Sequence, residues 1–173
     1  GALTRTANNV TPGNNCTVTV TNSEPTTFQD ITFGVPAPAV NTNNGRSNFF
    51  VIAGFTDCME IDVDWTSDNS YVDVVYDFTK PVYNLVFRIG DIDKASASSN
   101  SYYDRVTITG LNGSTSVSPA SITEINPSNY VKISGNVVHA NNANSQGGNA
   151  TTNTSNVSSQ QGTVEVNFGS QGV

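Results

Sequence analysis

The sequence predicts an all-β protein, with two antiparallel sheets packed as a jelly-roll-like sandwich. Short runs of residues alternate between apolar and polar side chains with a period of two, as strands do when one face is buried. Turn-forming residues interrupt these runs about every 8–12 residues, a spacing typical of sandwiches. The 3.6-residue apolar spacing of a helix is missing from the sequence. Strand order, and the choice between jelly-roll and immunoglobulin-like connections, stay open.

The first strand is expected at residues 17–21, after an irregular or edge-pairing segment over residues 1–15. Threonine and valine alternate in this first strand, and a similar pattern returns at residues 31–35 beyond an Asn-Ser-Glu-Pro turn. Pro36 and Pro38 then end the second strand, because proline lacks the N–H that a ladder uses.

Three strands are expected to form a meander over residues 59–65, 71–78 and 83–89, after a buried strand at residues 49–52. Their alternation assigns apolar side chains inward, among them Trp65, Val72, Val74, Tyr76, Phe78, Tyr83, Leu85, Phe87 and Ile89. Carboxylates then line the outer face: Glu60, Asp62, Asp64, Asp73 and Asp77.

The C-terminal part of the sequence is expected to hold the remaining strands. Asn112 and Gly113 mark a tight hairpin turn, because Asn-Gly supplies the positive φ angles of such turns. Strands are expected at residues 106–109, 116–117, 130–134 and 163–168. Residues 141–161 are low in complexity and rich in Asn, Ser, Thr and Gly, which predicts a long surface loop.

Length and composition favour one extracellular domain over residues 16–173. The chain has 173 residues, a size at which a single core is ordinary. Its net charge of −7 argues against nucleic-acid binding, which needs clustered Lys and Arg. The sequence contains no run of about 18 apolar residues, so a membrane-spanning helix is not predicted. Gly1, Ala2 and Leu3 lack signal-peptide character, so we expect a chain already processed or cut from a longer one.

The two cysteines, Cys16 and Cys58, lie far apart in the sequence and lack Cys-x-x-Cys spacing. In an exported protein we expect them to form a disulfide that pins the N-terminal segment to the sheet. The alternative is two buried thiols.

Asp91, Asp93 and Asp104 are the candidate metal ligands. They lie where two expected strands meet a polar loop. Calcium takes six to eight oxygen ligands in flexible geometry, so carboxylates gathered at strand ends suit Ca²⁺. The alternative is that Asp91 and Asp93 only end a strand, since Asp is common in turns.

Catalysis is not expected from this sequence. His139 is the single histidine, no Gly-x-Ser-x-Gly motif is present, and we expect His139 to be a surface residue. Residues two apart on any strand share one face, so the spacing of the carboxylates on the acidic strands does not by itself indicate a catalytic pair of a glycosidase. We therefore favour the interpretation that these carboxylates form a solvated sheet face.

Tyr102 and Tyr103 are the candidate ligand-binding residues, because they lie in the loop beside the expected metal ligands and aromatic rings stack on sugars. Adjacent residues of an extended chain point to opposite sides, so only one of the two is expected to contact a ligand. Ordinary packing is the alternative. Five possible glycosylation sequons begin at Asn15, Asn112, Asn149, Asn153 and Asn156.

Residues 86–93 read Val-Phe-Arg-Ile-Gly-Asp-Ile-Asp, and residues 104–108 read Asp-Arg-Val-Thr-Ile. This combination resembles a β-sandwich module of secreted and surface-anchored bacterial proteins, which recurs in large adhesins and gliding-associated proteins of Bacteroidota. The likeness covers about residues 49–168. It implies a calcium-stabilised, jelly-roll-like domain used in adhesion or carbohydrate binding, with Asp91, Asp93 and Asp104 as ligands.

Members of that group usually continue with a further strand after the one that matches residues 163–168. We therefore expect either that such a segment has been removed or that N-terminal residues of a neighbouring subunit fill the position. The expected function is a non-catalytic, calcium-stabilised surface module whose partner is a surface glycan or a neighbouring subunit. The alternatives are a structural subunit of a surface fibre and, third, a polysaccharide-active enzyme.

Overall fold

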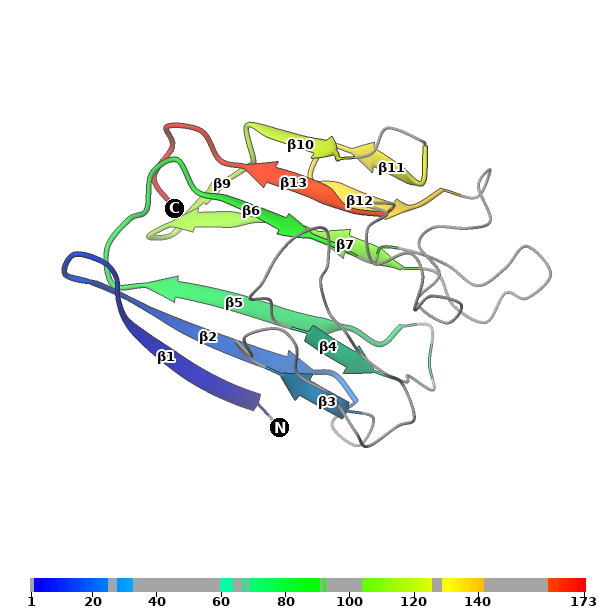
Figure 1. Ribbon diagram of the computed structural model, residues 1–173, viewed down its shortest axis with the longest axis horizontal. Coiled ribbons are helices and arrows are strands. Elements are labelled where there is room, and N and C mark those ends of the chain that lie inside the picture. The colour runs from blue at the N-terminus through cyan, green and yellow to red at the C-terminus, as the bar shows by residue number, and fades with distance from the viewer. Residues whose placement is uncertain are drawn as a thin grey trace. The chain divides into compact units, whose positions relative to one another are not determined.

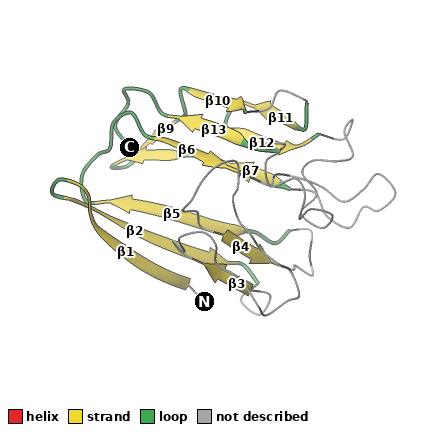
Figure 2. Cartoon of the chain, viewed as in Figure 1, coloured by secondary structure: helices red, strands yellow, loops and turns green. Residues whose placement is uncertain are grey.

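The computed structural model describes residues 2–24, 28–32, 60–63, 67, 69–90, 92, 104–125, 129–141 and 162–173. These residues form strands in antiparallel ladders joined by loops, and helices are absent from the described ranges (Figures 1 and 2). The predicted all-β, sandwich-like fold is confirmed. None of the described residues belongs to a helix long and apolar enough to cross a membrane.

The contacts of the chain divide it into two compact units. Unit 1 consists of Gly1–Gly34 and Met59–Val82, and unit 2 consists of Val35–Cys58 and Tyr83–Val173. Each unit is therefore assembled from two separate stretches of sequence.

Unit 1 contains a three-stranded sheet of order β1-β2-β5 and a separate strand pair β3-β4. The bounds are β1 Ala2–Thr11, β2 Asn14–Asn22, β3 Phe28–Thr32, β4 Glu60–Val63 and β5 Val72–Phe78. The N-terminal segment is thus a strand at the end of its sheet order, with a shift of register between Ala7 and Thr11, and it turns into β2 through Gly13 at a φ of 72°.

Alternation along β2 gives this sheet two different faces. Cys16 and Val20 are buried on one face, where Val20 lies opposite Val74 of β5. The other face carries hydroxyls from Thr17, Thr19 and Thr21 in the alternating positions that the sequence predicts.

Asn14 secures the end of this sheet. Its buried side-chain amide donates to the Lys80 carbonyl at 3.0 Å, and its Oδ1 accepts from the Lys80 amide at 3.0 Å and from the Thr79 hydroxyl at 2.9 Å. A buried amide costs free energy unless it is hydrogen-bonded, and here both ends of the amide are satisfied.

Unit 2 contains two three-stranded sheets and a hairpin, with sheet orders β10-β13-β6 and β11-β12-β7 and hairpin β8-β9. The bounds are β6 Val86–Ile89, β7 Arg105–Thr107, β8 Gly110–Asn112, β9 Thr115–Val117, β10 Ser121–Glu124, β11 Val131–Ser134, β12 Val137–Ala140 and β13 Val164–Asn167. Strands β7, β9, β11 and β13 lie at or near the expected positions, whereas β8, β10 and β12 were not expected. The Asn-Gly turn, with Gly113 at a φ of 59°, is confirmed.

One apolar core joins the two sheets of unit 2. Val164 and Val166 of β13 pack in the same buried cluster as Val131 of β11 and Val138 of β12. The cluster is completed by Ile92, Ile108, Val117 and Phe168. Each fully buried side chain of this size contributes about 1.5–3 kcal/mol relative to exposure, so this unit has a substantial core of its own.

The predicted meander of residues 59–65, 71–78 and 83–89 is wrong. β4 pairs with β3, β5 with β2 and β6 with β13, so the three strands belong to three different sheets. Alternation fixes which face of a strand is buried, but it does not name the neighbouring strand. Two residues expected to point inward are largely exposed, Tyr76 at 50% and Tyr83 at 61%, while Leu85, Phe87 and Ile89 pack on the core as predicted.

Several expectations lie outside the described residues. They are the strand at 49–52, the prolines Pro36 and Pro38, the inward position of Trp65, and the loop at 141–161 beyond Asn141.

Candidate metal and ligand-binding sites

Ile92 lies between two of the predicted calcium ligands and is fixed at the start of β13. Its backbone amide donates to the Gly162 carbonyl at 3.1 Å, and its side chain is 1% exposed within the core of unit 2. Gly162 has a φ of +67°, and a Cβ there would lie 2.7 Å from the Ile92 carbonyl oxygen. This close approach requires glycine.

Asp104, the third predicted ligand, directly precedes β7. It is half-buried, and its backbone carbonyl accepts from the amide of Ala140, the last residue of β12, at 3.1 Å. β6 and β12 run toward the same side of the unit (Figure 1). Ile92, three residues after β6, and Asp104 therefore lie at the same end of unit 2.

The remaining residues of this predicted site lie outside the described part of the chain. These are Asp91, Asp93, Tyr102 and Tyr103. The described residues contain no group of three or more His, Cys, Asp or Glu side chains placed to hold a metal ion. Both the calcium site and the aromatic ligand site stay predictions.

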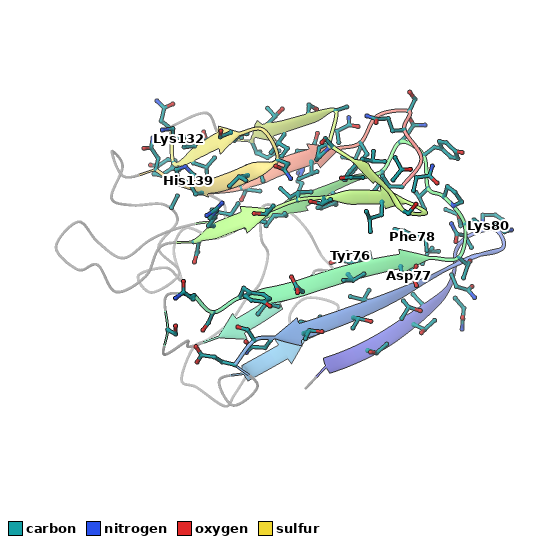
Figure 3. All side chains as sticks on the ribbon, turned by 180° about the vertical axis from the view of Figure 1, so that it is seen from behind. Tyr76, Asp77, Phe78, Lys80, Lys132 and His139 are labelled. Atoms are coloured by element: carbon teal, nitrogen blue, oxygen red, sulfur yellow. The ribbon has the colours of Figure 1, made fainter. Side chains whose placement is uncertain are left out.

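Cys16 is 5% exposed on the inner face of β2, and Cys58 lies outside the described residues, so the disulfide stays a prediction. Burial raises the pKa of the Cys16 thiol, and the negative charge of Asp77 raises it further. Partial burial likewise raises the pKa of Tyr76, with a smaller contribution from Cys16. Figure 3 shows Tyr76 and Asp77 following one another along β5.

The acidic residues that the structure describes belong to two different sheets and not to the single sheet that was expected. Asp73 and Asp77 are exposed on β5, whereas Glu60 and Asp62 belong to β4, which is in another sheet. This separation removes the geometric basis for pairing carboxylates of these two strands across one sheet.

His139 is half-buried in the middle strand of the β11-β12-β7 sheet. Its Nδ1 lies 2.9 Å from the Ala140 carbonyl oxygen. Its cross-strand neighbours are Lys132 on β11 and Arg105 on β7, and Figure 3 shows Lys132 and His139 next to each other. Sequence reasoning missed this grouping because it depends on the register between β12 and β7, which are distant in sequence.

The sequons fall in different settings. Asn15 is half-buried in β2, and its backbone bonds to Thr79, whereas Asn112 is exposed at the β8–β9 turn. Asn149, Asn153 and Asn156 lie outside the described residues. A sixth sequon, which sequence reasoning overlooked, begins at Asn9 in β1 and is readable as Asn-Val-Thr.

Comparison with protein-family models, with curated proteins and with solved structures found no match to this chain.

Proposed function

We propose that the chain is a non-catalytic extracellular surface module for adhesion or carbohydrate binding, stabilised by a structural calcium ion. The observation that supports this proposal is the position of Ile92 and Asp104 at one end of unit 2. Asp91 and Asp93 adjoin Ile92 in the sequence, and we propose that they meet Asp104 at that end. Carboxylates contributed by separate strands suit the high coordination number of Ca²⁺.

In this proposal the ion has a structural role and the neighbouring loop has the binding role. Calcium held by Asp91, Asp93 and Asp104 ties residues 93–103 to two strands of the core, which limits the conformations open to Tyr102 and Tyr103. An aromatic ring held in this way presents its face to a pyranose with little loss of conformational entropy on binding. The partner is then a glycan at a cell surface.

A printed glycan array tests this function. The wild-type protein is expected to bind a subset of saccharides in calcium buffer and to bind them more weakly in EDTA. One of the two variants Tyr102→Ala and Tyr103→Ala is expected to abolish the calcium-dependent binding, whereas Tyr71→Ala, which removes an exposed tyrosine of unit 1, is expected to leave it intact. Absence of glycan binding by the wild-type protein would contradict the carbohydrate function.

A second candidate function is a structural subunit of a surface fibre. The observation that favours it is β1, a ten-residue strand that has β2 on one side and no described strand on the other. An open edge of this length presents backbone donors and acceptors to a strand of another molecule. Ordered polymers that disappear when residues 2–11 are deleted would support this function over the first.

A further inference from the structure

Three side chains that can carry positive charge form one cross-strand row in unit 2. Lys132 of β11 lies opposite His139 of β12, and His139 lies opposite Arg105 of β7. Neighbouring strands are about 4.7–4.9 Å apart, so the row spans roughly 10 Å.

This row faces away from the core. The residues that alternate with it on the same strands, Val131, Val138 and Val106, pack in or against the buried cluster. Lys132 and Arg105 are exposed and His139 is half-buried. The next row on the same face adds the hydroxyls of Ser134 and Thr107, which flank Val137 and are both exposed.

The row gathers cationic side chains on a chain that is acidic overall. The chain has a net charge of −7, with seven Lys and Arg residues and one His, yet two of those seven and the single His meet here. Within the described part of the chain, neither Lys132 nor Arg105 takes part in an ion pair.

Two carboxylates belong to this neighbourhood. Asp104 directly precedes Arg105 in the sequence, and Glu124 accepts a hydrogen bond from the backbone amide of Tyr130 at 2.9 Å.

The imidazole of His139 is hydrogen-bonded to its own strand. The carbonyl of Ala140 can only accept, so the Nδ1 of His139 carries the proton in their hydrogen bond.

We propose that the outer face of the β11-β12-β7 sheet binds an acidic saccharide, one that carries carboxylate or sulfate groups, through Lys132 and Arg105, while the Nε2 of His139 between them can accept a hydrogen bond from a sugar hydroxyl. This inference rests on the proposed carbohydrate function and names a second site for it, formed by a sheet face. The guanidinium of Arg105 offers paired donors to a carboxylate or sulfate, Lys132 adds a point charge, and the hydroxyls of Ser134 and Thr107 can bond to sugar hydroxyls.

The charge balance favours a saccharide over a nucleic acid. Affinity for nucleic acid depends on many phosphate contacts, roughly 6–10 in a typical DNA-binding protein. The cationic side chains of this row, on a protein that is acidic elsewhere, are enough to bind one or two anionic groups of a short polysaccharide segment, but too few for the many phosphates of a nucleic acid.

The test compares saccharides that differ only in charge. The probes are oligogalacturonate, its methyl ester, chondroitin sulfate and desulfated chondroitin, printed on one array. Binding to oligogalacturonate but not to its ester identifies carboxylate as the recognised group, and binding to chondroitin sulfate but not to the desulfated polymer identifies sulfate.

The variant Lys132→Gln/Arg105→Gln is expected to lose at least roughly tenfold in affinity for the acidic probe, since charge-assisted hydrogen bonds are removed. Lys80→Gln/Arg88→Gln removes the same number of positive charges at exposed positions elsewhere and is expected to bind as wild type does. If the double variant has a lowered melting temperature, Lys132→Gln alone replaces it.

Three results would overturn the inference, and they are distinguishable. Equal binding by Lys132→Gln/Arg105→Gln and wild type, or binding to neutral probes alone, removes this site but leaves the proposed function standing. Absence of binding to any saccharide, acidic or neutral, removes both.

Discussion

The backbone amide of Ile92 donates to the carbonyl of Gly162 at 3.1 Å, and nothing larger than a hydrogen fits on the Gly162 Cα beside it. The two residues join the end of β6 to the start of β13. Any ion held by the residues flanking Ile92 would depend on this junction for its position.

Gly162→Ala is expected to destabilise the protein by roughly 2–4 kcal/mol, because it combines a strained positive φ with a Cβ placed 2.7 Å from the Ile92 carbonyl oxygen. Urea unfolding measures the loss. Gly113→Ala is the matched control, since Gly113 has a similar φ of +59° but no atom within 4 Å of the added Cβ. If both variants lose the same free energy of unfolding, the close approach of the added Cβ to the Ile92 carbonyl oxygen does not destabilise the protein.

Calcium is expected to raise the melting temperature of the wild-type protein, because an ion that binds only the folded state stabilises it by mass action. Asp104→Asn is expected to abolish this rise, whereas Asp73→Asn, an exposed carboxylate of unit 1, is expected to retain it. Scanning calorimetry in calcium and in EDTA provides the comparison. An unchanged midpoint for wild type in EDTA would refute the calcium site.

Oxidised protein is expected to contain a Cys16–Cys58 disulfide. The bond spans 58 − 16 = 42 positions, and closing a loop of this length is expected to stabilise the fold by about 2–4 kcal/mol. Intact mass before and after reduction, with alkylation of the denatured chain, counts the thiols, and urea unfolding of both forms gives the difference. Two alkylated cysteines in the unreduced, denatured protein would favour the alternative of two thiols.

Reduced protein is expected to lose stability as the pH rises above about 9. The thiol of Cys16 has its pKa raised from 9.0 in the folded state, so between the two pKa values the unfolded chain releases a proton that the folded chain retains. The contribution of the protonated Cys16 thiol to the free energy of unfolding is fully present below pH 9, and it is lost as the pH rises through the pKa of the folded state. Tyr76 adds to this fall above pH 10.

Cys16→Ala isolates the thiol contribution to that pH dependence. Urea midpoints measured in a reducing agent from pH 7 to pH 10 are expected to fall less steeply for Cys16→Ala than for wild type. Identical slopes would show that Cys16 does not govern the alkaline loss.

Local pattern predicted the strands well because burial on one face leaves a period of two in the sequence. β5 appears where its alternation indicates, and so does the hairpin around Asn112 and Gly113, whereas β6 covers only the last four residues of the strand expected at 83–89. Pairing was mispredicted because the partner of β6 is β13, far along the chain, and alternating side chains carry no information about that partner.

The sites show the same division. Asp104 could be chosen as a candidate ligand from its residue type and its place before a strand, which are local properties. The row of Lys132, His139 and Arg105 could not, because it exists only in the register of β11, β12 and β7. Tyr83 was expected in the core, yet its ring is exposed against Gly172, since the regular strand begins only at Val86.

β13 has β10 on one side and β6 on the other, and it is the last strand of the described chain. Its Glu165 forms an ion pair with Arg88 of β6 across 77 positions of sequence. During synthesis, β6 and β10 are therefore complete long before the strand that joins them exists. Contacts of such long range form slowly, so the folding of unit 2 waits for the C-terminal strand and its edges stay open until then.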